Sequence, residues 1–365
     1  MARHATARPR RLVAGLLALG AALAPLPTHA ARPYYAGKTV EIVVPFGPGG
    51  GTDVWARFVA PYLQKHVPGN PRVIVKNIPG GESITGANAF ADSARPDGLA
   101  LLATSATTAF HYLLGRPQVR YDFAKLTPVI VTATGGVIYA APRAGIRTPA
   151  DLLKPAAPLV YGGISATGLD LVTLLSFELL KLDVRVVLGF EGRGPARLAF
   201  ERGETTIDYQ TTTAYQTQVV PLVAQGKATP LMSFGLLTAP GTVERDPTVP
   251  DLPTVPEVYQ QLYKRPPSGE VWRAYLAFMA AGFAYQKALW APDGTPREAL
   301  EALYEGARQL IDSAEFKEKS RELMEGYPTY PGNAIERAVR EALTLPDDVR
   351  AFARTLVSTK YGVKF

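Results

Sequence analysis

The stretch Thr39-Val-Glu-Ile-Val-Val-Pro-Phe-Gly-Pro-Gly-Gly-Gly-Thr-Asp53 decides the fold class. Residues 39–45 form a β-branched run typical of a strand, and residues 46–51 form a glycine-rich loop. Thr52 and Asp53 mark the start of a helix, because the apolar residues that follow recur at helical spacing. Strand, loop and helix in succession are the repeating unit of α/β proteins.

The same unit recurs along the chain as far as Phe234. Residues 39–133 and 134–239 form two similar halves, and the alternation of strands and helices in each predicts parallel sheets covered by helices. The last third is mostly helical, and Thr254-Val-Pro-Glu257 and Thr295-Pro-Arg-Glu298 predict helix starts with a capping box. Segment 240–271 is rich in proline and charge and predicts an exposed excursion. Further strands are expected at 72–76, 99–104, 127–133, 137–141, 159–162, 184–190, 206–209, 229–234 and 288–291.

The composition excludes several classes of protein. The chain has 365 residues, 47% of them hydrophobic, which argues against disorder. The absence of cysteine from the sequence rules out disulfides, a thiol nucleophile and a zinc–thiolate site. The net charge is +7, but four of the 39 basic residues lie within residues 1–30, and the rest give 35 − 32 = +3. So small an excess of positive charge argues against a nucleic-acid partner.

Residues 1–30 have the pattern of a secretory signal peptide. Basic residues within 1–11 precede the apolar run 12–23, and small residues end at Ala30. The apolar run is shorter than the ~20 residues that a membrane span needs, although an uncleaved anchor is the alternative. We expect cleavage after Ala30 and a periplasmic mature protein.

Four loops that follow predicted strands carry small and hydroxyl residues. They are 46–53, 79–88, 104–108 and 162–168. Ligands of open α/β sheets bind beyond the carboxyl ends of the strands, and glycines together with helix starts suit an anion. The first loop lacks the Walker ending and the dinucleotide spacing. The four loops together predict a site for a polar ligand.

Catalytic and metal-binding patterns are scarce. Only His66 and His111 follow the signal peptide, and no Gly-x-Ser-x-Gly elbow occurs. Two interpretations stay open for His111, a ligand contact or a structural side chain, and for Asp53, a ligand contact or compensation of the helix dipole. We predict no catalytic residue, no metal and no cofactor.

At these loops the sequence resembles the periplasmic solute receptors of tripartite tricarboxylate transporters, the Bug family. The resemblance rests on motifs that run in family order. They are Val44-Pro-Phe-Gly-Pro-Gly-Gly-Gly-Thr-Asp53 with Ala56-Arg57, Asn77-Ile-Pro-Gly80, Thr85-Gly-Ala87, Pro96-Asp-Gly98, Tyr121-Asp122, Pro128-Val129, Leu252-Pro-Thr-Val255 and Ala291-Pro-Asp-Gly-Thr-Pro296.

The resemblance implies a two-lobed α/β periplasmic-binding-protein fold of the type II Venus flytrap kind. Lobe one would comprise 31–133 and 240–365, and lobe two would comprise 134–239. Such a protein is not an enzyme. It binds a small organic carboxylate as a monomer and delivers it to membrane permease subunits, or acts with a sensor kinase. An exported hydrolase or transferase and an orphan signalling receptor are the alternatives.

The resemblance also assigns ligand-binding residues and shows two departures. Glu82 lies in a loop that consists of small residues in the family, and Glu191 stands where the family has a lysine. Arg193 could compensate them, or both acids could be solvated rim charges. If they face the ligand, we expect a monocarboxylate, amino acid or aromatic acid to be preferred over citrate, and Glu191→Lys to improve dicarboxylate binding. The assigned residues are Phe46, Gly47, Gly50, Thr52, Asp53, Ser83, Ile84, Thr85, Ser105, Thr107, Ser165, Ala166, Thr167 and Glu191.

Overall fold

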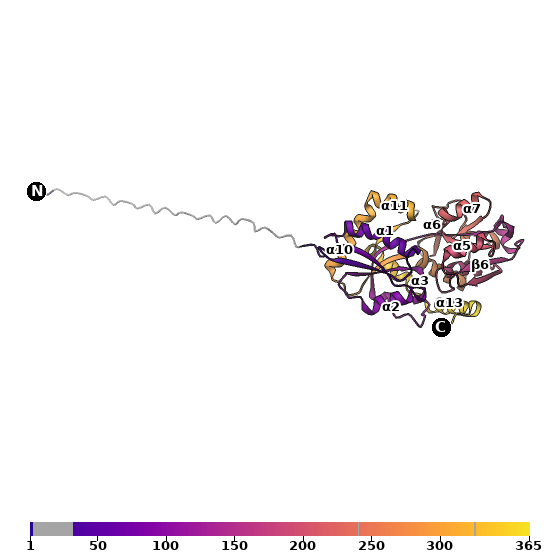
Figure 1. Ribbon diagram of the computed structural model, residues 1–365, viewed down its shortest axis with the longest axis horizontal. Coiled ribbons are helices and arrows are strands. Elements are labelled where there is room, and N and C mark those ends of the chain that lie inside the picture. The colour runs from indigo at the N-terminus through magenta and orange to yellow at the C-terminus, as the bar shows by residue number, and fades with distance from the viewer. Residues whose placement is uncertain (3–31, 240, 325) are drawn as a thin grey trace. The chain divides into compact units, whose positions relative to one another are not determined.

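Two β-sheets, each with its own helices, organise the chain in the computed structural model (Figure 1). The structure describes residues 1–2, 32–239, 241–324 and 326–365. The predicted signal peptide therefore lies outside the described residues, apart from its first two. Residues 33–365 form one compact unit.

The first sheet has six strands in the order β13-β4-β12-β3-β1-β2. Strand β1 pairs in parallel with β2 and β3, but β12 is antiparallel to both β3 and β4. The prediction of parallel sheets therefore holds for β1, β2 and β3 but not for β12, which enters the sheet only after the chain has returned from the second sheet. The strands are β1 Thr39–Val44, β2 Arg72–Asn77, β3 Ala100–Ser105, β4 Leu126–Thr132, β12 Lys287–Pro292 and β13 Thr329–Pro331.

Helices cover both faces of this sheet (Figure 1). On one face α1 packs against α10, and Trp55, Val59 and Leu63 of α1 are buried there with Ile42 of β1. On the other face α2 and α3 bury Phe90 and other apolar side chains. The helices are α1 Gly51–His66, α2 Ile84–Ser93, α3 Ala106–Leu113, α10 Arg297–Asp312 and α11 Ala314–Met324.

The second sheet has five strands in the order β7-β6-β8-β5-β9. Strand β6 is parallel to β7 and β8, whereas β5 is antiparallel to β8 and β9. The strands are β5 Gly136–Ala140, β6 Leu159–Gly163, β7 Val184–Leu188, β8 Ile207–Thr211 and β9 Thr229–Ser233, and the helices are α4 Asp170–Leu179, α5 Arg193–Glu201, α6 Thr212–Ala214 and α7 Val220–Ala224.

The chain crosses between the sheets at two segments that lie side by side. Residues 133–135 join β4 to β5, and residues 280–286 lead from helix α9 (Glu270–Met279) to β12. The Thr134 amide donates a hydrogen bond of 2.9 Å to the Phe283 carbonyl. The carboxyl ends of β3 and β8 lie at these crossings, because Ser105 pairs with Lys287 and the Thr212 amide donates to the Gly135 carbonyl.

Many described residues of segment 240–271 are exposed, as its composition predicts, but others pack into the protein. The segment contains the second strand of the β10–β11 hairpin (Leu236–Ala239 and Thr242–Glu244) and helix α8 (Val255–Tyr263), whose apolar face is buried. Asp246 is fully buried and accepts hydrogen bonds from Thr212 and Tyr327, which lie on α6 and before β13. The polar composition thus reflects buried hydrogen-bonding partners as well as solvent contact.

Two smaller expectations about helices have different outcomes. The capping box at Thr254 is present, since its hydroxyl accepts from the Glu257 amide and Glu257 reaches back. The box at Thr295 is absent, because the Thr295 hydroxyl donates instead to the Pro292 carbonyl and Pro296 precedes α10. The final helices are α12 Gly332–Ala342 and α13 Asp347–Tyr361, and every helix among the described residues is too short or too polar to cross a bilayer.

Candidate functional site

Loops from the two sheets meet at Glu82. A methyl group placed on Gly168 would lie 3.3 Å from the Thr107 hydroxyl and 3.9 Å from the Glu82 carboxylate. Glu82 Oε2 also lies 3.5 Å from His111 Nε2. Burial raises the pKa of the Glu82 carboxyl, and a hydrogen bond from Ser165 and the charge of Arg116 offset this only partly. The predicted loops after β2, β3 and β6 therefore lie together.

The loop after β6 holds its hydroxyl groups in place. Ser165 Oγ lies 3.0 Å from Thr167 Oγ1 and accepts a hydrogen bond from the Thr167 amide. The carboxylate of Asp170 accepts from the amides of Ile164 and Ser165. Thr167 and Ala166 are buried. The loop's own hydrogen bonds therefore fix its conformation.

The predicted ligand-binding residues of the loops after β2 and β3 lie in different environments. Ser83 is buried, and its hydroxyl has no hydrogen-bond partner among the described residues. Ile84 is buried, whereas Thr85 is exposed with its hydroxyl against Gly80. Ser105 is buried at the end of β3.

The first loop is held by Asp53. Its buried carboxylate accepts hydrogen bonds from the Gly49 amide, Asn77 Nδ2 and Arg57 Nε at 2.8–3.0 Å. Burial acts to raise the pKa of Asp53, but the hydrogen bonds from Arg57, Gly49 and Asn77 outweigh it and hold the pKa below its usual value. Of its two open roles, the structure favours the structural one. Phe46 and Gly47 are half-buried, Gly50 is exposed and Thr52 is buried.

Arg193 forms ion pairs with two buried aspartates of the protein. It bonds to Asp208 and, at 3.0 Å, to Asp170, and its side chain is 14% exposed. It also donates to the carbonyls of Gly162 and Tyr209. Glu191 is exposed. Arg193 therefore neutralises two buried aspartates and does not compensate Glu191.

A cavity of about 520 Å³ lies beside the crossing segments. Its lining combines α1 and β12 of the first sheet with β8 and α6 of the second. Lys287, at the start of β12, lines it and lies opposite Ser105 and Thr132 in the strand register. The described lining is Gly49, Gly51, Val54, Trp55, Phe58, Thr132, Ala133, Thr134, Thr211, Thr213, Ala214, Thr217, Gln218, Gln286, Lys287, Leu323 and Met324.

Lys287 has no ion-pair partner in the part of the chain that the structure describes. Its Nζ lies 4.0 Å from the position of a methyl group on Gly51, at the first turn of α1. Burial lowers the pKa of the Lys287 ammonium to about 8. A cation beside a helix N-terminus, which is itself partly positive, is favourable only when an anion joins them.

Neutral donors line the cavity together with the lysine. Gln286 is 5% exposed and lines the cavity, and its side-chain amide has no hydrogen-bond partner among the described residues. The amides of Gly51 and Thr52 likewise have no acceptor within the described ranges. Thr134 adds a buried hydroxyl, which donates to the Gly135 carbonyl at 3.4 Å. A cation with neutral donors beside it is the set of groups that a carboxylate requires.

Sequence reasoning missed Lys287 and Gln286. Both immediately precede the predicted strand 288–291, where a lysine ordinarily indicates a solvated strand end. Their importance depends on the antiparallel register that puts Lys287 beside Ser105. That register comes from long-range pairing, so no local motif reports it.

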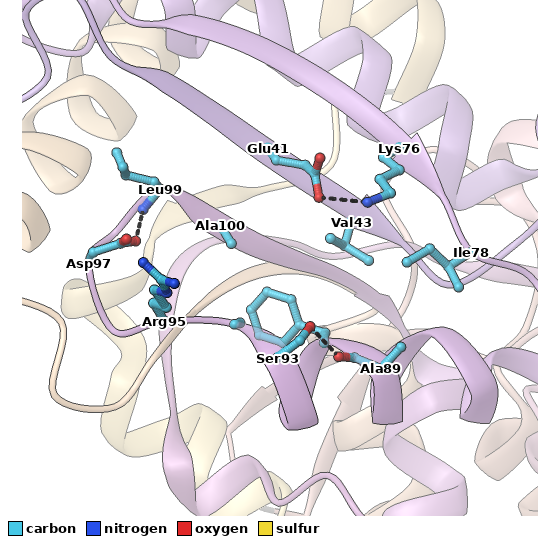
Figure 2. Close-up of a pocket in the computed structure, with 12 residues that line it drawn as sticks. Glu41, Val43, Lys76, Ile78, Ala89, Ser93, Arg95, Asp97, Leu99 and Ala100 are labelled. Carbon is cyan, nitrogen blue, oxygen red and sulfur yellow. Dashed lines mark hydrogen bonds and ion pairs between the residues drawn. The ribbon is translucent and has the colours of Figure 1, made fainter.

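A second hollow, of about 280 Å³, lies on the α2 side of the six-stranded sheet (Figure 2). Several of its charged and polar groups are paired within the protein. Lys76 Nζ lies 3.4 Å from Glu41, and Asp97 accepts from the Leu99 amide at 2.9 Å. Arg95 also lines this hollow, and its side chain has no hydrogen-bond or ion-pair partner among the described residues.

Comparisons with known proteins agree with this architecture. The chain is 27% identical over 319 residues to a UPF0065 protein of Bordetella pertussis, covering 85% of each chain. It is 38% identical over 97 residues to Protein BugT of the same organism, covering 26% of this chain and 29% of BugT. No protein-family model matches the chain.

Solved structures show the same fold. The periplasmic binding protein BugD has a TM-score of 0.63 at 20% identity, with 88% of this chain and 99% of BugD covered. MatC of Rhodopseudomonas palustris, with bound malate, has a TM-score of 0.59 at 21% identity, covering 86% and 99%. Rpa4515 of the same organism, with adipate, has 0.61 at 24% identity, covering 87% and 97%.

The two sheets, their crossings and these neighbours define a two-lobed α/β periplasmic-binding-protein fold, which confirms the predicted fold class. Within that class, the relatives and neighbours to which the chain is similar include UPF0065 proteins and the Bug proteins BugT and BugD. The comparisons thus agree with the resemblance that the sequence motifs carry.

Proposed function

We propose that this protein is a periplasmic receptor that binds a small organic carboxylate between its lobes and delivers it to the permease of a tripartite tricarboxylate transporter. The observation that carries the proposal is Lys287, which lies without a described acidic partner in a cavity lined by both sheets. Its fold neighbours MatC and Rpa4515 hold malate and adipate, which are also carboxylates. We assign residues 31–133 and the chain from β12 onward to lobe one, and residues 134–279 to lobe two, because α8 packs against β9 and α9 against α4 of the second sheet. The boundary expected at residue 240 is therefore moved to the crossing at 280–286.

Binding rather than catalysis is the function that the site supports. BugD and its neighbours are binding proteins, so an exported hydrolase or transferase is not favoured. The buried imidazole of His111 lies beside Glu82 and is not paired with a nucleophile among the described residues. We propose that the receptor acts as a monomer and that the permease recognises its ligand-bound form.

Two observations support a periplasmic location. Periplasmic binding proteins are the structural neighbours, and residues 1–30 have the pattern of a signal peptide. Edman sequencing of protein recovered from the periplasm is expected to begin at or near Ala31. Exported protein that still begins with Met1 would contradict the cleavage.

A thermal-shift screen of small mono-, di- and tricarboxylates tests the function. A ligand at one hundred times its dissociation constant stabilises the folded state by about 2.7 kcal/mol. Calorimetry then measures the affinity of each hit in wild type and in Lys287→Met, with the exposed Lys227→Met as the matched control. The absence of binding by any carboxylate, or unchanged affinity in Lys287→Met, would contradict the proposal.

A further inference from the structure

The cavity at Lys287 is lined by two kinds of side chain. Lys287, which lies beside the first turn of α1, is accompanied by neutral polar groups from threonines and glutamines. The apolar side chains come from α1 and α11. They are Val54, Trp55, Phe58, Leu323 and Met324.

We propose that this cavity binds an amphipathic monocarboxylate, with its carboxylate at Lys287 and its apolar body against Val54, Phe58 and Leu323. The inference rests on the proposed function and names the class of ligand. A linear or aromatic acid with several apolar carbons fits the description. The volume of about 520 Å³ lies in the usual range of small-molecule sites, roughly 300–1,000 Å³.

The charges of the lining allow one carboxylate. Lys287 is the one charged side chain among the described lining residues, and the other polar members are threonines and glutamines. A second carboxylate in the cavity would lose water without gaining a second cation, because the remaining polar lining is neutral. Burying an unpaired charge in this way is strongly unfavourable.

Two of the apolar side chains that line the cavity are exposed and would be covered by a bound ligand. Val54 is 49% exposed and Leu323 is 46% exposed, and both belong to the few large hydrophobic side chains that the described part of the protein leaves in solvent. They come from different helices, α1 and α11, and both line this cavity. Apolar side chains that gather at one hollow mark a binding surface more often than isolated ones do.

Calorimetry with heptanoate, pimelate and heptanamide tests the inference, because the three share one chain length. Pimelate adds a carboxylate at the far end, and heptanamide removes the charge. We expect wild type to bind heptanoate at least about tenfold more tightly than either analogue, as one charged hydrogen-bonded contact predicts. Lys287→Met is expected to abolish the preference for the acid over the amide.

Leu323→Ser tests the apolar lining of the cavity. Leu153→Ser is the matched control, because Leu153 is 45% exposed but does not line the cavity. Leu323→Ser is expected to lower the affinity for heptanoate several-fold and to leave the affinity for acetate unchanged, whereas Leu153→Ser is expected to change neither affinity. Binding of pimelate at least as tightly as heptanoate, or equal effects of the two serine variants, would overturn the inference. If pimelate binds tightly and Lys287→Met abolishes this binding, the proposed receptor function stands and only the proposed class of ligand is wrong. If no carboxylate binds, the receptor function itself fails.

Discussion

Lys287→Met should make the unliganded protein more stable while removing its anion site. Burial lowers the pKa of Lys287 from an ordinary 10.5 to about 8, so the unfolded chain holds this proton more strongly than the folded one. At about pH 7 the difference of 10.5 − 8 corresponds to a destabilisation of about 3 kcal/mol. Replacing the ammonium by an apolar group of similar length removes this cost.

The dependence on pH separates this effect from ordinary repacking. Because the unfolded state binds more protons between about pH 8 and about pH 10.5, wild-type stability contains a contribution that rises with pH in that window and is constant below it. Lys287→Met lacks the rise. Urea unfolding at about pH 7 and about pH 10 should therefore show the two proteins differing most at the lower pH.

Lys227→Met is the control, because Lys227 is exposed and lies outside the cavity. It should unfold like wild type at both pH values. An equal difference between Lys287→Met and wild type at both pH values would refute the reasoning, since a gain from packing alone does not depend on pH. A destabilised Lys287→Met would show that the ammonium already has a partner.

Three further results are expected. Arg193→Met should destabilise the fold by about 3–5 kcal/mol in urea unfolding, because it leaves two buried aspartates unpaired; the exposed Arg202→Met should cost less than about 1 kcal/mol. Burial, together with the charge of a nearby arginine, lowers the pKa of His111 to about 4, so wild type should lose roughly 2 kcal/mol between about pH 7 and about pH 5 as the unfolded chain takes up this proton, and His111→Gln should lose less in the same titration. Ser165→Ala and Thr167→Ala distinguish the loop after β6 from the cavity at Lys287, which neither residue lines: an affinity for the carboxylate about ten- to a hundredfold weaker in calorimetry, with little change in unfolding, would place the ligand at the loop, whereas unchanged affinity in both is what binding at Lys287 predicts.

Local patterns were enough to predict most elements and the fold class. The β-branched run at 39–45 and the apolar spacing after Thr52 correspond to β1 and α1 within one or two residues. The capping box at Thr254 is present because all its partners lie within one helical turn. In each case the deciding contacts are close in sequence.

What the sequence could not supply depends on long-range pairing. The antiparallel direction of β12, the position of Lys287 beside Ser105 and the burial of Asp246 against Tyr327 all join distant segments. Helix α9 was not predicted, because its apolar residues pack against α4 and its N-terminal end continues a stretch of polar composition. The resemblance placed the loops of the site, whereas the cavity depends on the register of the sheet.

Glu82 is the departure from the family pattern that the structure makes most consequential. Its backbone has φ 54, its carboxylate lies beside His111, and Glu191, the other departure, is exposed. A carboxylate at the junction of the lobes repels a second ligand carboxylate there, about threefold in affinity for charges ~7 Å apart in water and more where water is excluded.

Glu82→Gly removes the charge without backbone strain, because glycine adopts a positive φ freely. We expect it to raise the affinity for a dicarboxylate relative to the matched monocarboxylate, as Glu191→Lys would if Glu191 also faced the ligand. Glu191→Gln, which removes an exposed charge, is the control and should leave the ratio as in wild type. An unchanged ratio in Glu82→Gly would mean that Glu82 serves the contact between the lobes and takes no part in selecting the ligand.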